Sequence, residues 1–226
     1  ISENLDGGYE KNYSKLPRGG TSIEEIAKMG GARYTLELSA FVPDEDSPAK
    51  YLKEVYGVPF ERLDLPVGLE FTDAFIEKLV SLGGKITDEI KDMRKRYLDA
   101  MIDSHKYNAE CRAVVFGEPD FTSSVVKLCC ENGAVPVVAA TGSVCKGFKE
   151  KVESYIRPAA EIAMEENFAV LDDIDFEKIE NLALGFKANL MIGSSDGRRI
   201  SERHGIELIR CAFPVHDRVG GQRTRI

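Results

Sequence analysis

The sequence predicts an α/β fold: a doubly wound, mainly parallel Rossmann-like sheet domain, preceded by a partial α/β lobe and a long bridging helix. First, residues 113–116 (Ala-Val-Val-Phe) are apolar without polar alternation, which is typical of a strand covered on both faces. Second, a turn, a helical pattern and another apolar run follow at once. Third, this unit repeats to the end of the chain, and alternating strands and helices favour a parallel sheet.

Composition sets the broad class of the protein. The 226 residues are 43% hydrophobic and 30% charged, which is ordinary for a globular chain. The net charge of −8 argues against nucleic-acid binding, and no apolar run approaches the roughly 20 residues of a membrane span. Five cysteines, mostly in apolar runs, indicate reduced thiols in a cytoplasmic protein. The polar start at Ile1, without a signal peptide or an initiator methionine, indicates a piece of a longer chain.

Residues 1–64 are expected to be the remnant of a preceding Rossmann-like domain. Residues 1–20 are rich in loop-forming residues. Thr21 and Glu24 have the spacing of a capping box, so a short helix to Met29 should follow. Alternation over residues 33–39 predicts a strand, and residues 47–56 a second helix. This set is too small to bury a core of its own.

Residues 65–110 are expected to form a linker and two bridging helices. After the linker at 65–69, Thr72 can cap a helix, with Phe71 packing against its apolar stripe as a staple. A longer helix should run from about Thr87 to about Asn108. Its apolar face should carry Met93, Tyr97, Met101 and His105. We expect His105 to be a hydrogen-bonded core or interface residue.

Residues 111–226 are expected to form the C-terminal Rossmann-like domain. Gly117 ends the first strand, Pro119 and Asp120 suit the first turn of a helix, and Asn132-Gly133 should end that helix. Strands are expected at 113–116, 135–140, 168–171, 190–193 and 206–212. Helices are expected at 121–131, 147–164 (with Pro158 as a break), 175–186 and 196–204.

Loops at the carboxyl ends of such strands gather at one edge, where ligands usually bind. The candidates are Gly117-Glu118, Thr141-Gly142-Ser143, Asp172-Asp173, Ser194-Ser195-Asp196 and Pro214-Val215-His216. The first lacks the second glycine of a dinucleotide fingerprint, and the loop after Thr141 lacks the order of a phosphate loop. We therefore predict no tight binding of a dinucleotide or a nucleoside triphosphate.

Metal and catalytic sites find little support. Five acidic residues could converge on Mg²⁺, but acids at helix starts more simply stabilise the helix dipole: Glu118, Asp120, Asp172, Asp173 and Asp196. The adjacent Cys129 and Cys130 point about 100° apart on a helix, and no C-x-x-C motif occurs. The three histidines are isolated, and hydrolase motifs are absent. We assign no catalytic residue and no metal ligand, and the cofactor-binding residues are unknown.

The C-terminal end of the chain is basic. Its arginines could face an anionic ligand, although a salt-bridged subunit interface is the more ordinary interpretation: Arg210, Arg218, Arg223 and Arg225.

Six segments, in order along nearly the whole chain, resemble the later half of a β-type subunit of the nitrogenase component 1 family. They are Gly20–Ile26, Leu65–Phe75, Arg96–His105, Gly117–Phe121, Met191–Arg198 and Phe213–Arg218. The resemblance implies a subunit with three Rossmann-like domains that pairs with an α-type subunit and works with an iron-protein reductase. It implies a role in nitrogen fixation, either in the catalytic oxidoreductase or in the paralogous cofactor-assembly scaffold. Two features favour the assembly scaffold over the catalytic subunit: the short segment from Arg199 to Ile206, and Gly220–Arg223.

The resemblance also bears on cofactors. It implies an iron–sulfur cluster in the full-length complex, with the β-type cysteine ligands in an upstream N-terminal domain. No cofactor is then expected in this segment, which alone should be inactive. The alternative from a different class is a free-standing α/β small-molecule or Mg²⁺-binding domain.

Overall fold

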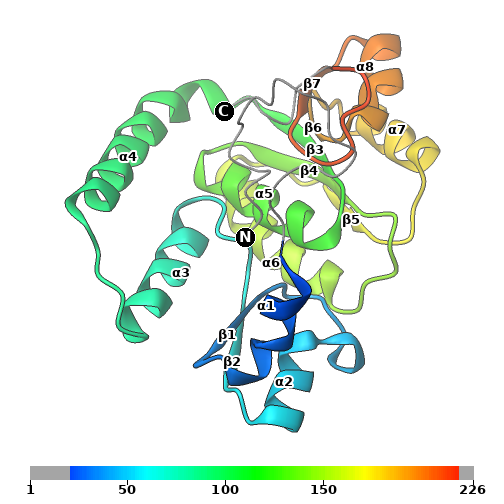
Figure 1. Cartoon of the computed structure of the whole chain (residues 1–226). Helices are drawn as coiled ribbons and strands as arrows, with labels where there is room; N and C mark the ends of the chain where they lie inside the picture. Colours follow the sequence, from blue (N-terminus) through cyan, green and yellow to red (C-terminus); the bar gives the residue numbers. More distant parts are fainter. Residues whose placement is uncertain (1–20, 219–226) are drawn as a thin grey trace, which may run out of the picture. The chain divides into compact units, whose positions relative to one another are not determined.

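The computed structural model describes residues 21–218 and divides into two compact units (Figure 1). Unit 1 contains residues up to Glu37, Val42–Arg62 and the residues from Arg218 on; unit 2 contains Leu38–Phe41 and Leu63–Asp217. Residues 1–20 and 219–226, which include Arg223 and Arg225, lie outside the described residues.

Unit 1 holds most of two short strands and the helix between them. Its elements are α1 (Ile23–Ala27), η2 (Met29–Gly31), β1 (Thr35–Leu38), η3 (Asp44–Asp46), α2 (Pro48–Tyr56) and β2 (Phe60–Leu63). β1 and β2 form a two-stranded sheet. The expected helix at 47–56 is confirmed, because the Ser47 side chain caps α2 and Gly57 ends it at φ 72°. Strand β2 was not expected.

The cap of α1 corrects the predicted capping box. Ser22, not Thr21, precedes the helix. Its hydroxyl accepts the N–H of Glu25 at 3.1 Å, and the Glu25 carboxylate accepts the N–H of Ser22 at 3.2 Å. Both Thr21 and Ser22 stand three residues before a glutamate, so the sequence allows a capping box at either residue. The structure forms the box at Ser22.

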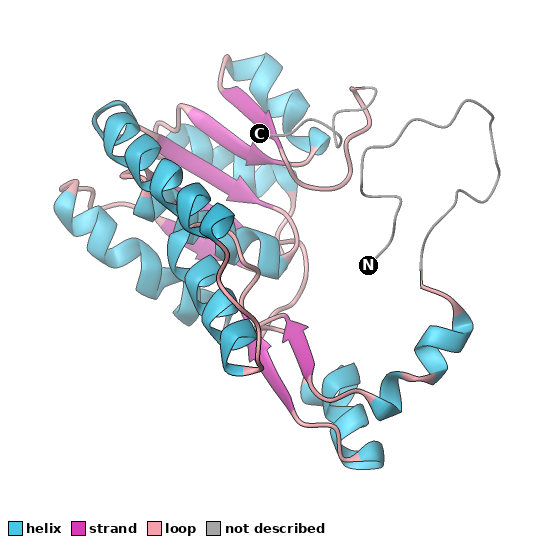
Figure 2. Cartoon of the chain, turned by 60° about the vertical axis from the view of Figure 1, so that its left-hand side comes forward, coloured by secondary structure: helices cyan, strands magenta, loops and turns pink. Residues whose placement is uncertain are grey.

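The sheet of unit 2 has five parallel strands in the order β5-β4-β3-β6-β7, which confirms the doubly wound topology. The strands are β3 (Arg112–Phe116), β4 (Val135–Ala140), β5 (Ala169–Leu171), β6 (Leu190–Gly193) and β7 (Glu207–Arg210). The helices are α5 (Pro119–Glu131), α6 (Phe148–Ile162), α7 (Phe176–Gly185) and α8 (Arg198–His204), and Figure 2 shows helices on both sides of the sheet. The core lies on the central strands, where Val114, Val115 and Val138 are fully buried.

Pro158 does not break α6, so that expectation was wrong. The helix continues through the proline to Ile162. Val152, Ile156 and Ala160 are buried on both sides of Pro158, and packing of this face outweighs the backbone hydrogen bond that a proline removes.

Helices α3 (Leu69–Ser81) and α4 (Asp88–Asn108) precede the sheet. Thr72 is not the cap of α3: the helix begins at Leu69, and the Thr72 hydroxyl donates to the carbonyl of Pro66 at 3.1 Å. Instead the Glu131 carboxylate of α5 accepts the N–H groups of Leu69 at 2.7 Å and Glu70 at 3.0 Å. A side chain 61 residues away therefore supplies the cap.

Helix α4 begins where it was expected, after Thr87, whose hydroxyl accepts the N–H of Ile90 at 3.3 Å. None of its residues is buried; Met93 is 58% exposed and Ile102 70%. His105 is exposed, so the expectation of a core residue was wrong, and the alternative of an interface residue stays a prediction. Its ring lies over Gly133, where a Cβ would come within 2.7 Å of it. No helix in residues 21–218 is long and apolar enough to cross a membrane.

Candidate functional site

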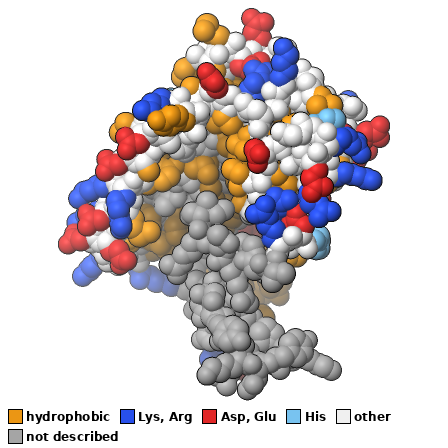
Figure 3. All heavy atoms as spheres, turned by 90° about the horizontal axis from the view of Figure 1, so that it is seen from above, with side chains coloured by type: hydrophobic (Ala, Val, Ile, Leu, Met, Phe, Trp, Pro, Cys, Tyr) orange, Lys and Arg blue, Asp and Glu red, His pale blue; other side chains and the backbone are white. Residues whose placement is uncertain are grey.

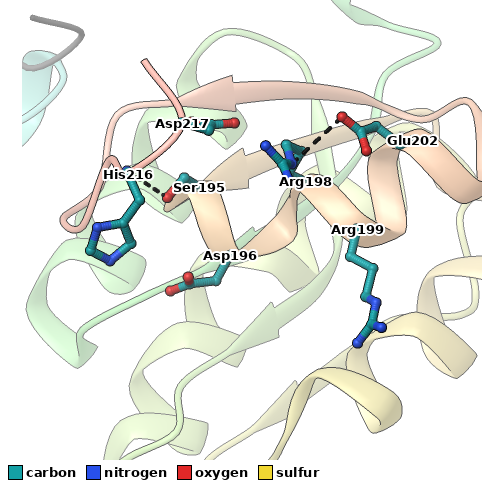
Figure 4. A pocket seen from close by; sticks show the side chains of 7 residues that line it. All are labelled: Ser195, Asp196, Arg198, Arg199, Glu202, His216 and Asp217. Carbon is teal, nitrogen blue, oxygen red and sulfur yellow. Dashed lines mark hydrogen bonds and ion pairs between the residues drawn. The ribbon is translucent and has the colours of Figure 1, made fainter. Parts of the chain in front are cut away.

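Two of the five candidate loops meet in one pocket at the carboxyl edge of the sheet in unit 2. One loop follows β6 through the short 3₁₀ helix η4 (Ser195–Gly197), and the other follows β7. The pocket has a volume of about 510 Å³ and is lined by Ser195, Asp196, Arg198, Arg199, Glu202, His216 and Asp217 (Figure 4).

Hydrogen bonds to Ser195 hold the two loops together. Its backbone N–H donates to the carbonyl of Pro214 at 3.0 Å, and its hydroxyl donates to the same carbonyl at 3.1 Å. The hydroxyl also accepts the backbone N–H of His216 at 2.9 Å (Figure 4). Because Ser195 is only 7% exposed, these bonds satisfy a buried polar group and fix the pocket wall.

The pocket contains charges of both signs. Arg198 lies 3.6 Å from Glu202, one helical turn away. The Asp217 carboxylate accepts two hydrogen bonds from Nε of Arg210 and lies 2.6 Å from Nη2 of the same arginine. Arg210 holds the pKa of Asp217 below its usual range by these hydrogen bonds. Within its own chain, Arg210 is thus paired with Asp217, and its contact with a ligand or another subunit stays a prediction.

The other three loops do not line this pocket, and acidic side chains in or next to two of them accept hydrogen bonds from other segments. The Asp172 carboxylate accepts the N–H of Cys145 at 2.8 Å. Asp120 accepts from Ser39 and Ala40, on a different segment. Across residues 21–218, no group of three or more His, Cys, Asp or Glu side chains is placed to hold a metal ion.

An aromatic ring fills the crevice between β3 and β6, where the strand order reverses. The Phe116 ring lies against Gly193 and Gly197, and a Cβ on either glycine would come within 2.5 Å of it. The ring also packs edge-on against Phe176, with centroids 5.5 Å apart. Dinucleotides bind outside this position in doubly wound sheets, and here the two glycines face a side chain of the protein itself.

The five cysteines are free thiols, and burial raises the pKa of each. The pKa of Cys130 is about 12, and those of Cys145 and Cys211 about 11. Metal ligation and nucleophilic attack both require the thiolate, which burial disfavours here. As placed here, these residues do not fit the ligand set of an iron–sulfur cluster.

Sequence reasoning found Ser195, Asp196 and His216 but missed Arg198, Arg199, Glu202 and Asp217. The spacing of Arg198 and Glu202 by four residues on a helix directly after a candidate loop was the available signal. Figure 3 shows acidic and basic side chains interspersed on the face seen from above.

The fold is that of a doubly wound α/β domain joined to a smaller α/β unit, with a mixed-charge pocket at the carboxyl edge of the larger sheet. A family model described as "Nitrogenase component 1 type Oxidoreductase" matches residues 5–226. The chain belongs to this family.

Three similar proteins show the range of the family. The chain is 33% identical over 212 residues to the nitrogenase molybdenum-iron protein beta chain of Methanothermobacter marburgensis, covering 93% of this chain and 44% of that protein. It is 28% identical over 223 residues to the nitrogenase iron-molybdenum cofactor biosynthesis protein NifN of Mesorhizobium japonicum, covering 98% and 44%. The solved structure of nitrogenase Cp1 at pH 6.5 matches with a TM-score of 0.84 and 29% identity, covering 95% and 46%. The chain therefore spans a little under half the length of these relatives.

Proposed function

We propose that this chain is part of a β-type subunit of a nitrogenase component 1-type iron–sulfur oxidoreductase complex that acts in nitrogen fixation. The observation that carries the proposal is the family match over residues 5–226, together with identity to nitrogenase beta chains. The proposal includes two roles, the catalytic component and the cofactor-assembly scaffold, because both kinds of relative match over nearly the whole chain.

In this proposal the chain is organised in three parts. Residues 1–64 end a preceding Rossmann-like domain, 65–110 form a linker and bridging helices, and 111–226 form the last domain. The ligands of the iron–sulfur cluster belong to the remainder of the subunit, and this segment binds no metal of its own. We place the protein in the cytoplasm, a reducing compartment that suits five unpaired cysteines.

The partners in the proposal are an α-type subunit and an iron-protein reductase. Helices α3 and α4 offer one side of the subunit interface, since they expose large apolar side chains: Val80, Met93 and Ile102. Obligate interfaces are large and rather apolar, so exposed apolar side chains on these helices suit a permanent partner.

The test is co-purification of the tagged full-length protein with the α-type product of a neighbouring gene, followed by light scattering. We expect an assembly of both chains. Ile102→Asp should weaken it by several kcal/mol, because it buries an unpaired charge. Ile162→Asp is the matched control, since Ile162 is also exposed (84%) but lies at the end of α6.

If the protein stays monomeric and does not bind the α-type product at micromolar concentration, the alternative interpretation is favoured, a free-standing α/β small-molecule or Mg²⁺-binding domain. A complex that forms equally well with Ile102→Asp would leave the proposed function intact and exclude this part of α4 as the interface.

The absence of a resident cofactor is tested separately. The 226-residue segment, purified without oxygen, should be colourless. Calorimetry with NAD or ATP should show no micromolar binding, because Phe116 fills the crevice between β3 and β6. Stoichiometric iron with visible charge-transfer absorption, or micromolar affinity for either nucleotide, contradicts this part of the proposal.

A further inference from the structure

Two segments in the first third of the chain belong to unit 2, and each begins at the carboxyl end of a strand of the small sheet. Residues 38–41 contain the end of β1, and residues 63–64 contain the end of β2; both segments belong to unit 2. We call these two stretches the crossing segments. The rest of β1, α2 and β2 belongs to unit 1.

Asp120 binds the first crossing segment. Its carboxylate accepts the hydroxyl of Ser39 at 2.5 Å and the backbone N–H of Ala40 at 2.7 Å. The Ser39 hydroxyl in turn accepts the N–H of Phe41 at 3.2 Å. Asp120 stands in the first turn of α5, where the helix dipole stabilises its negative charge. Hydrogen bonds to a carboxylate are about twice as strong as neutral ones, so this contact holds the segment firmly.

Helix α6 binds both crossing segments through two of its first residues. The ring of Phe148, which is fully buried, packs edge-on against Phe41 with centroids 5.6 Å apart. The ammonium of Lys151 lies 5.7 Å from the Phe41 ring centre and 2.7 Å from a carboxylate oxygen of Asp64. Lys151 thus contacts both crossing segments, one through a cation–π interaction and the other through an ion pair.

We propose that Asp120, Phe148 and Lys151 form a clamp that anchors the crossing segments on the first turns of α5 and α6. The clamp acts where loops follow strands β1 and β2. The clamp therefore controls how often residues 38–41 open.

Hydrogen–deuterium exchange on the full-length protein tests the clamp. Asp120→Ala removes both acceptors and should speed exchange in residues 38–41 about tenfold or more. Exchange in β3 and β4 should stay within about twofold of the wild type. Ser39→Ala removes one of the two hydrogen bonds and should give a smaller rise in the same residues. Once Asp120 is absent, Ser39→Ala should add only the loss of the hydrogen bond from Phe41 to Ser39, because both substitutions remove the contact between Ser39 and Asp120.

The matched control is Glu177→Ala. Glu177 is an acidic residue in the first turn of α7, as Asp120 is in α5, and it is exposed. If Asp120 served only the dipole of its helix, Asp120→Ala would speed exchange in residues 119–124 and leave residues 38–41 unchanged. That result, or equal effects of Asp120→Ala and Glu177→Ala on residues 38–41, would overturn the clamp. If Asp120→Ala fails to fold, Ser39→Ala and Phe41→Ala must still speed exchange in residues 38–41, and no change in either contradicts the proposal.

Discussion

Gly193 and Gly197 are expected to tolerate alanine to different degrees, although both contact the same aromatic ring. A Cβ on Gly193 would lie 2.5 Å from two ring carbons of Phe116 and 2.6 Å from the Phe116 carbonyl oxygen. A Cβ on Gly197 would meet only side chains, the nearest being the Phe116 ring at 2.5 Å and the Met191 methyl at 3.3 Å. A side chain can turn away, but the carbonyl belongs to the backbone of a central strand.

Gly193→Ala should therefore lower the free energy of unfolding by about 3 kcal/mol, the upper part of the range for an overpacked core. With a urea m-value of about 2 kcal/mol/M, the unfolding midpoint should fall by about 1.5 M. Gly197→Ala should cost about 1–3 kcal/mol. Its cost should shrink in a Phe116→Leu background, because the smaller side chain leaves space, whereas the cost of Gly193→Ala should largely remain.

The assay is urea unfolding followed by circular dichroism for the two single variants and their pairs with Phe116→Leu. Gly185→Ala is the control, because a Cβ there meets nothing within 4 Å. Its stability should change by no more than about 0.5 kcal/mol. A Gly193→Ala midpoint equal to that of the wild type, or full rescue of this variant by Phe116→Leu, would refute the reasoning.

Three further predictions follow from single contacts. Glu131→Ala removes the cap of α3 and should cost about 1–2 kcal/mol, measured by urea unfolding, with faster exchange at Leu69 and Glu70; unchanged exchange there contradicts it. Arg210 lowers the folded pKa of Asp217, so their pair should stabilise the fold above the unfolded pKa of about 3.9 and lose this contribution as pH falls through the folded value. The stability difference between wild type and Asp217→Asn should thus be constant from about pH 5 to 7 and shrink below about pH 4; a constant difference to pH 2 argues against it. Cys130, with a pKa of about 12, should resist iodoacetamide at pH 8 in the native protein but react in urea, as mass spectrometry can show.

The strands could be predicted because each is a short apolar run between clear breakers. The bounds of β4 and β6 agree at both ends with the expectation. Both runs are apolar on both faces, so the pattern alone indicates burial in a parallel sheet. Strand β2 was not predicted, because Phe60 and Leu63 flank two charged residues. This segment shows neither clean alternation of polar and apolar residues nor continuous apolar character.

Helix starts were predicted less well, because local patterns do not reveal contacts from distant segments. Ser47 and Thr87 stand at the expected starts of their helices, and each caps its helix through its own side chain. The start of α3 depends on Glu131, which lies in another helix. A search for Ser, Thr, Asp or Asn near this start finds Thr72 and places the cap three residues inside the helix.

The site was predicted in part for a geometric reason. Neighbouring strands are about 4.8 Å apart, so loops after β5 and β7 at opposite ends of a five-stranded sheet are separated by about 19 Å. Asp172 and His216 therefore cannot share a small ligand. Sequence order places all these loops at one edge but does not give the strand order, and only the strand order brings Ser195 and His216 together.

The pocket lies beside β6 and β7, whereas the Phe116 ring packs against Gly193 and Gly197 between β3 and β6. Phe116 ends a strand, where a glycine-rich turn would otherwise leave room for phosphates, and its ring needs two glycines opposite to fit. Comparing the sequence with a dinucleotide-binding fingerprint shows only that glycines are missing after β3. It does not explain the glycines at and after the end of β6. The structure gives the physical reason for Gly193 and Gly197 on the neighbouring segment: they make room for protein instead of ligand. In this domain the position between β3 and β6, where the strand order reverses, is thus part of the hydrophobic core. The charged pocket lies beside β6 and β7.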